Sequence, residues 1–186
     1  MAGKVVGVLA LQGGYERHVR ALEAAGAQAV EVRTAAELDS TDGLVLPGGE
    51  STTMLKILHR ENLFEPLRAY GQAKPIFGTC AGAILLATHV TSPEQQSLGL
   101  MDIEVQRNAY GRQLDSRVVN LPSTLGDLEA VFIRAPIIRA AGPAVQVLAT
   151  YNGDPVLAEQ GRHLVATFHP ELTTDPRVHA YFLSKL

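Results

Sequence analysis

The single cysteine of the chain, Cys80, stands between two glycines in the segment Gly78-Thr79-Cys80-Ala81-Gly82. Ile76 and Phe77 predict the end of a buried strand before it, and the apolar run from Ala81 to His89 predicts a short helix after it. Gly-x-Cys-x-Gly at such a junction is the thiol form of the nucleophile elbow. The helix dipole there favours the thiolate. The pattern predicts a nucleophile, and the alternative is a buried structural cysteine.

A nucleophilic thiol needs a base, and His169 in His169-Pro170-Glu171 is the candidate. Pro170 favours an extended backbone at His169, where residues two apart point to the same side. Glu171 can then accept a hydrogen bond from the imidazole and fix its tautomer. A strand-end histidine beside a solvated glutamate is the alternative. Together with Cys80, the segment predicts a Cys-His-Glu triad.

The other five histidines have other expected places. His18 and His59 are predicted on solvated helix faces, His89 at the end of the elbow helix, His163 at the start of a strand, and His179 in the last helix.

Two consecutive glycines, Gly48 and Gly49, follow a predicted strand in the segment Pro47-Gly48-Gly49-Glu50-Ser51-Thr52. Ligands of open α/β sheets bind at the carboxyl ends of strands. Glycines let backbone N–H groups approach a ligand closely, as an oxyanion hole requires. The segment is a candidate oxyanion hole, and a plain turn with a Ser/Thr helix cap is the alternative.

The elements that must position these residues change character along the chain. In the first half, strands alternate with helices, which predicts a mostly parallel sheet. The expected strands are 5–10, 29–32, 43–46 and the one ending at 76–77; the expected helices are 15–25, 35–38, the one carrying Met54, Leu55 and Leu58, and 63–70.

The second half predicts strands joined by short turns, which implies antiparallel pairing and a mixed sheet overall. The expected strands are 101–107, 117–121, 130–134, 145–151, 155–160 and 163–169, followed by a helix at 176–186. The fold class is therefore a three-layer α/β fold with a mixed, mostly parallel central sheet flanked by helices. Residues 1–186 are expected to form a single domain.

The composition excludes several classes of protein. The chain has 186 residues, 46% hydrophobic and 19% charged, with a net charge of −3. This balance gives no reason to expect nucleic acid or a membrane as partner. A single free thiol suits a reducing compartment, and we expect a cytoplasmic protein. No metal-ligand cluster or phosphate-binding loop is recognisable, so neither a metal nor another cofactor is expected.

With these residues identified, the chain resembles the class I (triad) glutamine amidotransferases, which have a flavodoxin-like architecture. Within that class it is similar to the glutaminase subunits of pyridoxal 5′-phosphate synthases, over essentially its whole length. The motifs that carry the closer similarity are 9–13, 47–54, 107–116, 132–136 and 169–173.

The resemblance implies hydrolysis of L-glutamine to L-glutamate and ammonia, with Cys80, His169 and Glu171 as catalytic residues. The ammonia would pass to a separate synthase (lyase) subunit in a hetero-oligomer, which makes pyridoxal 5′-phosphate from a pentose phosphate and a triose phosphate. It also implies an oxyanion hole from the backbone of Ala81 and of Gly48 or Gly49. The positions implied for glutamine binding are Gly49, Glu50, Ser51, Arg107, Ile133 and Arg134.

Three rival functions remain open at this point. The chain could serve another synthase, such as imidazole glycerol phosphate synthase, because the triad chemistry is shared. It could be a related cysteine hydrolase or peptidase with an elbow cysteine. It could also be a non-catalytic binding protein, against which the presence of all three triad residues argues.

Overall fold

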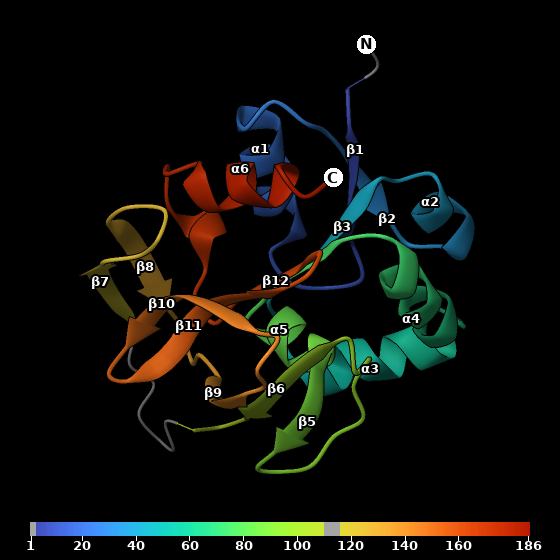
Figure 1. Cartoon of the computed structure of the whole chain (residues 1–186). Helices are drawn as coiled ribbons and strands as arrows, with labels where there is room; N and C mark the ends of the chain where they lie inside the picture. Colours follow the sequence, from blue (N-terminus) through green and yellow to red (C-terminus); the bar gives the residue numbers. More distant parts are fainter. Residues whose placement is uncertain (1–2, 110–115) are drawn as a thin grey trace.

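The computed structural model describes residues 3–109 and 116–186 (Figure 1). Its centre is a seven-stranded sheet in the order β10-β11-β12-β4-β3-β1-β2. The strands are β1 (Val5–Leu9), β2 (Gln28–Val32), β3 (Gly43–Leu46), β4 (Ile76–Thr79), β10 (Gln146–Tyr151), β11 (Asp154–Gln160) and β12 (His163–Ala166).

Strand direction divides this sheet as the sequence predicts. The pairs β1·β2, β1·β3, β3·β4 and β4·β12 are parallel, whereas β10·β11 and β11·β12 are antiparallel. The antiparallel pairs are joined by two-residue turns at Asn152-Gly153 and Gly161-Arg162. Parallel neighbours need long crossovers, which here are mostly helices. The mixed, mostly parallel sheet flanked by helices is confirmed.

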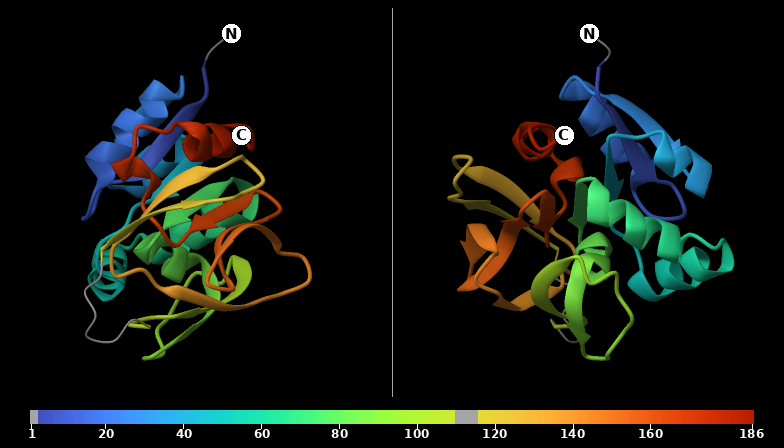
Figure 2. Two further views of the ribbon diagram at one scale, coloured as in Figure 1. Left: turned by 90° about the vertical axis from the view of Figure 1, so that its left-hand side faces the viewer. Right: turned by 45° about the vertical axis from the view of Figure 1, so that its right-hand side comes forward.

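Helices cover both faces of the sheet (Figures 1 and 2). They are α1 (Tyr15–Ala24), α2 (Ala35–Asp39), α3 (Ser51–Arg60), α4 (Phe64–Ala73), α5 (Ala81–Leu86) and α6 (Arg177–Leu183). Successive strand residues point to opposite faces, so Leu44 and Leu46 join the core beneath α3, α4 and α5. Val45 between them joins the other core, beneath α1 and α6. The result is the expected three-layer arrangement.

Two smaller sheets complete the fold. One contains β5 (Ala87–Thr91), β6 (Met101–Gln106) and β9 (Ile137–Ala141), and the other pairs β7 (Arg117–Leu121) with β8 (Leu128–Phe132). The elbow helix ends at Leu86, so the expectation that it runs to His89 is wrong. The segment that follows holds three β-branched residues, which favour a strand. The strand β9 was not predicted.

The strand expected over residues 163–169 ends at Ala166. The chain then leaves the sheet: the His169 N–H donates to the Val131 carbonyl at 2.8 Å, and Pro170–Leu172 forms a 3₁₀-helix, η1. Pro170 has no N–H to give to a strand ladder. Glu171 therefore does not lie on extended backbone, as the sequence suggested. No helix in the described ranges is both long and apolar enough to cross a bilayer.

Candidate active site

Cys80 occupies the sharp turn between β4 and α5. It has φ 51° and ψ −106°, a conformation that L residues with a side chain rarely adopt. The Cys80 N–H donates to the Ala166 carbonyl of the neighbouring strand β12 at 2.9 Å. Only 8% of the residue is exposed. Strain held by the surrounding structure is typical of a functional turn, and here it fits a nucleophile elbow.

The two glycines beside Cys80 are required by close backbone packing. A Cβ on Gly78 would lie 2.5 Å from the Gly82 carbonyl oxygen. A Cβ on Gly82 would lie 2.1 Å from the Leu46 carbonyl oxygen on β3. The elbow thus fits directly against the neighbouring strand, and a larger side chain at Gly78 or Gly82 would move Cys80.

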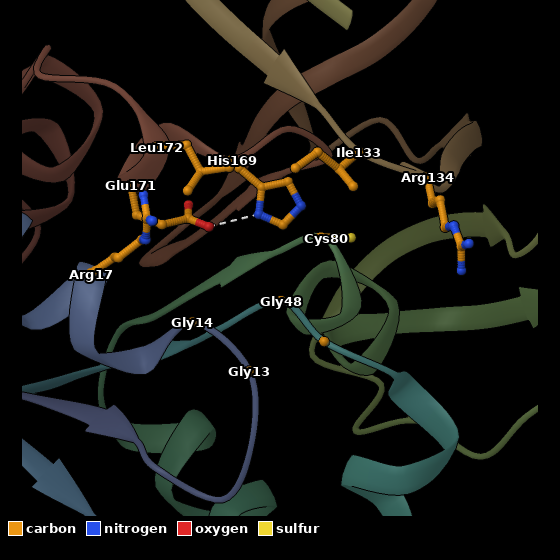
Figure 3. A pocket seen from close by; sticks show the side chains of 11 residues that line it. Gly13, Gly14, Arg17, Gly48, Cys80, Ile133, Arg134, His169, Glu171 and Leu172 are labelled. Atoms are coloured by element: carbon orange, nitrogen blue, oxygen red, sulfur yellow. Dashed lines mark hydrogen bonds and ion pairs between the residues drawn. The ribbon is translucent and has the colours of Figure 1, made fainter. Parts of the chain in front are cut away.

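His169 and Glu171 form the closest side-chain contact of the site. His169 Nδ1 lies 2.6 Å from Glu171 Oε1, and the two side chains are only 12% and 4% exposed. Figure 3 shows the imidazole between the Glu171 carboxylate on one side and Cys80 on the other. The 3₁₀ turn of η1 brings the carboxylate back to the ring. The three side chains lie in the order that a nucleophile, a base and an orienting acid require.

The pair carries opposite charges. Burial alone would lower the pKa of His169, but its hydrogen bonds with Cys80 and Glu171 raise that pKa to about 10. Burial raises the pKa of Glu171, but the hydrogen bond with His169 and the nearby imidazoles outweigh it and lower the pKa. At neutral pH an imidazolium therefore faces a carboxylate, with the Cys80 sulfur on its other side.

The backbone of Gly48 lies directly against the candidate triad. A Cβ on Gly48 would lie 2.7 Å from His169 Cε1 and 3.4 Å from Cys80 Cβ. A Cβ on Gly13, in the loop after β1, would lie 1.9 Å from the Gly48 carbonyl oxygen. The loops after β1 and β3 are therefore packed together, and each requires glycine.

Gly49 is held in a second way. It has φ 142°, and a Cβ there would lie 2.6 Å from Gln12 Nε2. The same Gln12 nitrogen donates to the Glu50 carbonyl at 2.8 Å. Gln12 thus fixes the segment that follows Gly48, a role in the site that was not predicted for it.

A pocket of about 550 Å³ opens over these residues (Figure 3). Its size is within the range of small-molecule sites. It is lined by Gly13, Gly14, Arg17, Gly48, Gly49, Cys80, Ile133, Arg134, His169, Glu171 and Leu172.

Seven of the expected site residues thus line one pocket, and four do not. Ala81 is buried directly after Cys80. Glu50 caps α3, accepting from the N–H groups of Thr52 and Thr53 at 3.0 and 2.8 Å. Ser51 Oγ donates to Gln95 at 3.2 Å, and Arg107 donates to the Thr52 hydroxyl at 2.7 Å.

The Glu50 carboxylate is thus held by the start of its own helix. Hydrogen bonds from Thr53 lower its pKa to about 2, although a small desolvation opposes them. The Arg107 guanidinium lies 3.8 Å from it. Glu50 and Arg107 form a charged group beside the pocket lining, and their contact with substrate stays a prediction.

Four pocket residues were not predicted: Gly13, Gly14, Arg17 and Leu172. A signal for the first two was available, because the segment 11–14 follows the first strand as Gly48 and Gly49 follow the third. The two strands are parallel neighbours, so their carboxyl ends meet at one edge of the sheet.

The expectation that His18 lies on a solvated helix face is wrong. His18 and His179 are both 0% exposed, and His18 Nδ1 lies 2.9 Å from His179 Nε2. His18 and Leu22, one turn apart, form the buried face of α1. His59 is exposed, as expected. No group of three potential metal ligands is found in residues 3–109 and 116–186.

Proteins of known sequence and structure are similar to this chain over its full length. The pyridoxal 5′-phosphate synthase subunit PdxT of Solibacter usitatus is 61% identical, covering 98% of this chain and 100% of that protein. The subunit PdxT of Koribacter versatilis is 53% identical, covering 96% and 93%. A crystal structure of a glutamine amidotransferase matches with a TM-score of 0.91 and 46% identity, covering 97% of each chain.

A more distant structure, that of PurLQS from Thermotoga maritima, has a TM-score of 0.67 at 19% identity, covering 99% of this chain and 95% of that one, and shows the shared fold alone. The family model described as the SNO glutamine amidotransferase family matches residues 8–186. The match includes the elbow, both glycine loops and the His169–Glu171 turn. The chain belongs to the SNO glutamine amidotransferase family.

Proposed function

We propose that the chain is the glutaminase subunit of a pyridoxal 5′-phosphate synthase. It hydrolyses L-glutamine to L-glutamate and ammonia, and it delivers the ammonia to a separate synthase (lyase) subunit in a hetero-oligomer. The observation that carries the proposal is full-length similarity, up to 61% identity, to proteins named as subunits of that synthase. The 2.6 Å contact between His169 and Glu171 beside an elbow cysteine supports the chemistry.

In the proposed mechanism, the Cys80 thiolate attacks the side-chain amide carbon of glutamine. His169, already charged, gives its proton to the leaving nitrogen, and ammonia departs from a γ-glutamyl thioester. The neutral imidazole then takes a proton from water, which attacks the thioester carbon. The C–S bond breaks, glutamate leaves, and the Cys80 thiolate and the charged His169 are restored. Glu171 holds the imidazole in position and stabilises its charged form in both half-reactions.

Negative charge that develops on the amide oxygen needs donors already in place. The N–H of Ala81, directly after the nucleophile, is the first proposed donor. The second comes from the Gly48–Gly49 segment. The Gly48 carbonyl lies against Gly13. The N–H of Gly49, on the opposite side of a trans peptide, therefore points away from that loop.

Glutamine binding is proposed at the pocket over Cys80. Ile133 and Arg134 line its far side, and Arg134 has φ 44°, which turns its backbone sharply after β8. Gly49 lies at the wall beside Gln12. Glu50 and Ser51, at the start of α3, and Arg107, directly after β6, are proposed to bind the charged ends of the amino acid.

We also infer that residues 1–186 form one glutaminase domain. The two apolar cores lie on opposite faces of the same central sheet, which supports this division. A cytoplasmic location is proposed because a catalytic thiol needs a reducing compartment to stay free. The proposed chemistry uses no cofactor.

The test is glutamate release from L-glutamine by the purified chain, with and without the pyridoxal 5′-phosphate synthase partner subunit. We expect release that the partner stimulates and that Cys80→Ala abolishes. Release that the same partner leaves unchanged would assign the glutaminase to another synthase. If neither sample released glutamate, the chain would be a different cysteine hydrolase or a non-catalytic binding protein.

A further inference from the structure

Beside Oε2 of Glu171, the oxygen that does not contact His169, lies a pair of buried histidines that the proposed mechanism does not use. His18 comes from α1 and His179 from α6, and their rings approach to 2.9 Å between His18 Nδ1 and His179 Nε2. The other nitrogen of His18, Nε2, lies 3.2 Å from the Thr79 hydroxyl and 3.4 Å from Glu171 Oε2. The pair thus connects the closing helix of the fold to the candidate triad.

The contact between His18 and Glu171 matters because of the second carboxylate oxygen of Glu171, Oε2. Oε1 is hydrogen-bonded to His169, but Oε2 is buried and has no hydrogen-bond partner among the described residues. A buried carboxylate oxygen without a donor is costly. The His18 nitrogen at 3.4 Å is the group that the structure places toward it. A small movement of either side chain would complete the hydrogen bond.

The contact between the two histidines decides which nitrogen of His18 carries a proton. If His179 donates to His18 Nδ1, the His18 proton sits on Nε2 and points at Thr79 and Glu171. Nδ1 of His179, for which the described part of the chain offers no hydrogen-bond partner, is then only an acceptor. In the reverse arrangement that Nδ1 is an orphaned buried N–H, and a lone pair of His18 faces the carboxylate. Orphaned buried N–H groups are rare, so the first arrangement is the stable one.

The charge state agrees with this assignment. Burial lowers the pKa of His18 to about 4, although Glu171 opposes the change, and the charged His169 lowers it further. Burial and the neighbouring His18 lower the pKa of His179 to about 3. Both rings are neutral at pH 7, so each has one donor and one acceptor nitrogen.

We propose that His18 is a positioning residue of the active site: its neutral ring, oriented by His179, directs Nε2–H to Glu171 Oε2 and holds the carboxylate against His169. Glu171 then receives a donor on each oxygen, one from each flanking imidazole. The carboxylate cannot rotate away from His169 without losing the second donor. This inference rests on the proposed glutaminase function for its kinetic consequence, but not for its structural one.

The test compares two substitutions that keep different halves of the ring. His18→Gln extends an amide N–H to about the place of Nε2, whereas His18→Asn reaches only the place of Nδ1 and leaves Glu171 Oε2 alone. We expect the Asn variant to lower kcat for glutamate release by about 10- to 100-fold with little change in KM. We expect the Gln variant to stay within about threefold of the unsubstituted chain. His59→Asn, on an exposed helix face, is the matched control.

A second measurement does not depend on activity. We expect the proton in the 2.6 Å contact between His169 and Glu171 to give a low-field proton NMR signal, which its absence from His169→Asn would assign. The proposal expects this signal to broaden or move upfield in His18→Asn and to persist in His18→Gln. If the chain hydrolysed no glutamine, the function would fail while this signal still tested the positioning role.

Urea unfolding of both variants shows whether they fold. A folded His18→Asn variant with unchanged kcat and an unchanged signal would overturn the proposal. So would equal losses in the Asn and Gln variants, since the ring would then serve only to fill space. If His18→Asn failed to fold, the signal and kcat of His179→Asn, which removes the donor to His18 Nδ1, would decide: no change in either would also overturn it.

Discussion

Two imidazoles approach the two oxygens of the same carboxylate, and they carry different charges. His169 meets Glu171 Oε1 at 2.6 Å and has its pKa raised to about 10. His18 lies 3.4 Å from Oε2 and has its pKa lowered to about 4. His18 is fully buried and the His169 side chain is only 12% exposed, so burial alone does not explain the difference. The partners of each ring decide its charge.

His169 has Glu171 and Cys80 as partners, and both favour its charged form. His18 has a neutral histidine and a hydroxyl within hydrogen-bond distance, and it faces the positive charge of His169 across Glu171. One carboxylate compensates one positive charge in this buried place. The positive charge lies on His169, the ring next to Cys80, so the proton is where the proposed reaction uses it.

Removing the anion between the two rings has the largest expected effect on this comparison. Glu171→Gln keeps the shape of the side chain but removes the charge that both imidazoles face. The pKa of His169 falls toward its ordinary value, and the ring is free to adopt the wrong tautomer. We expect kcat for glutamate release to fall by about 10³–10⁴-fold, as for the acid of other triads.

Glu65→Gln, on the exposed face of α4, is the control for a lost carboxylate and should leave kcat unchanged. A pH–rate profile measured on the same samples should show the titration attributed to His169 shifted to lower pH in Glu171→Gln. A kcat within tenfold of the unsubstituted chain would mean that Glu171 does not orient the base.

Acid should lower the stability of the folded chain by protonating its buried neutral histidines. Burial lowers the pKa of His18 and His163 to about 4 and that of His179 to about 3, all below the value of about 6.5 in an unfolded chain. The unfolded chain therefore binds protons first as the pH falls. The stability from keeping these rings neutral is complete above pH 6.5 and is lost as the pH falls through about 4.

For one histidine whose pKa is lowered from 6.5 to about 4, the loss of folding stability amounts to roughly 3 kcal/mol. His169 has the opposite sign: its contribution is complete below pH 6.5 and is lost as the pH rises through about 10. The midpoints of urea unfolding at pH 7 and pH 4.5 measure the loss of stability in acid. His163→Asn, which keeps an acceptor for the Ile76 N–H, should show a smaller fall. Equal midpoints at the two pH values would show that these rings are charged in the folded chain.

The parts of the site that depend on local sequence could be predicted. The elbow around Cys80 and the glycine loop after the third strand are short segments whose residue types restrict the backbone directly. The alternation of strands and helices likewise predicted the central sheet. His169 and Glu171 were expected near each other, although the backbone between them is a 3₁₀ turn and not extended.

The second side of Glu171 could not be predicted, because it is made by contacts between distant segments. His18 has charged neighbours in sequence, and its burial depends on α6, more than 150 residues away. The end of α5 at Leu86 depends on pairing between β5 and β6, which is also non-local. The motif at 107–116 is described only at 107–109 and 116, so residues 110–115 lie outside the described residues.

The smallest expected effect distinguishes the roles of the two groups near His18 Nε2, the Thr79 hydroxyl and Glu171 Oε2. Thr79→Val removes the hydroxyl at 3.2 Å and keeps the Glu171 carboxylate 3.4 Å from that nitrogen. We expect stability to fall by about 1 kcal/mol, because one buried hydrogen bond is lost. We expect kcat to change by less than about threefold, because the donor to Glu171 is kept.

The result also tests which route connects the histidine pair to Cys80. Thr79 directly precedes Cys80, so His18 could act on the nucleophile through the elbow backbone instead of through Glu171. In that case Thr79→Val would lower kcat as much as His18→Asn does, while the low-field signal of His169 stayed in place. A small loss in Thr79→Val beside a large one in His18→Asn, measured on folded samples, leaves Glu171 as the point where the neutral imidazole acts on the charged one.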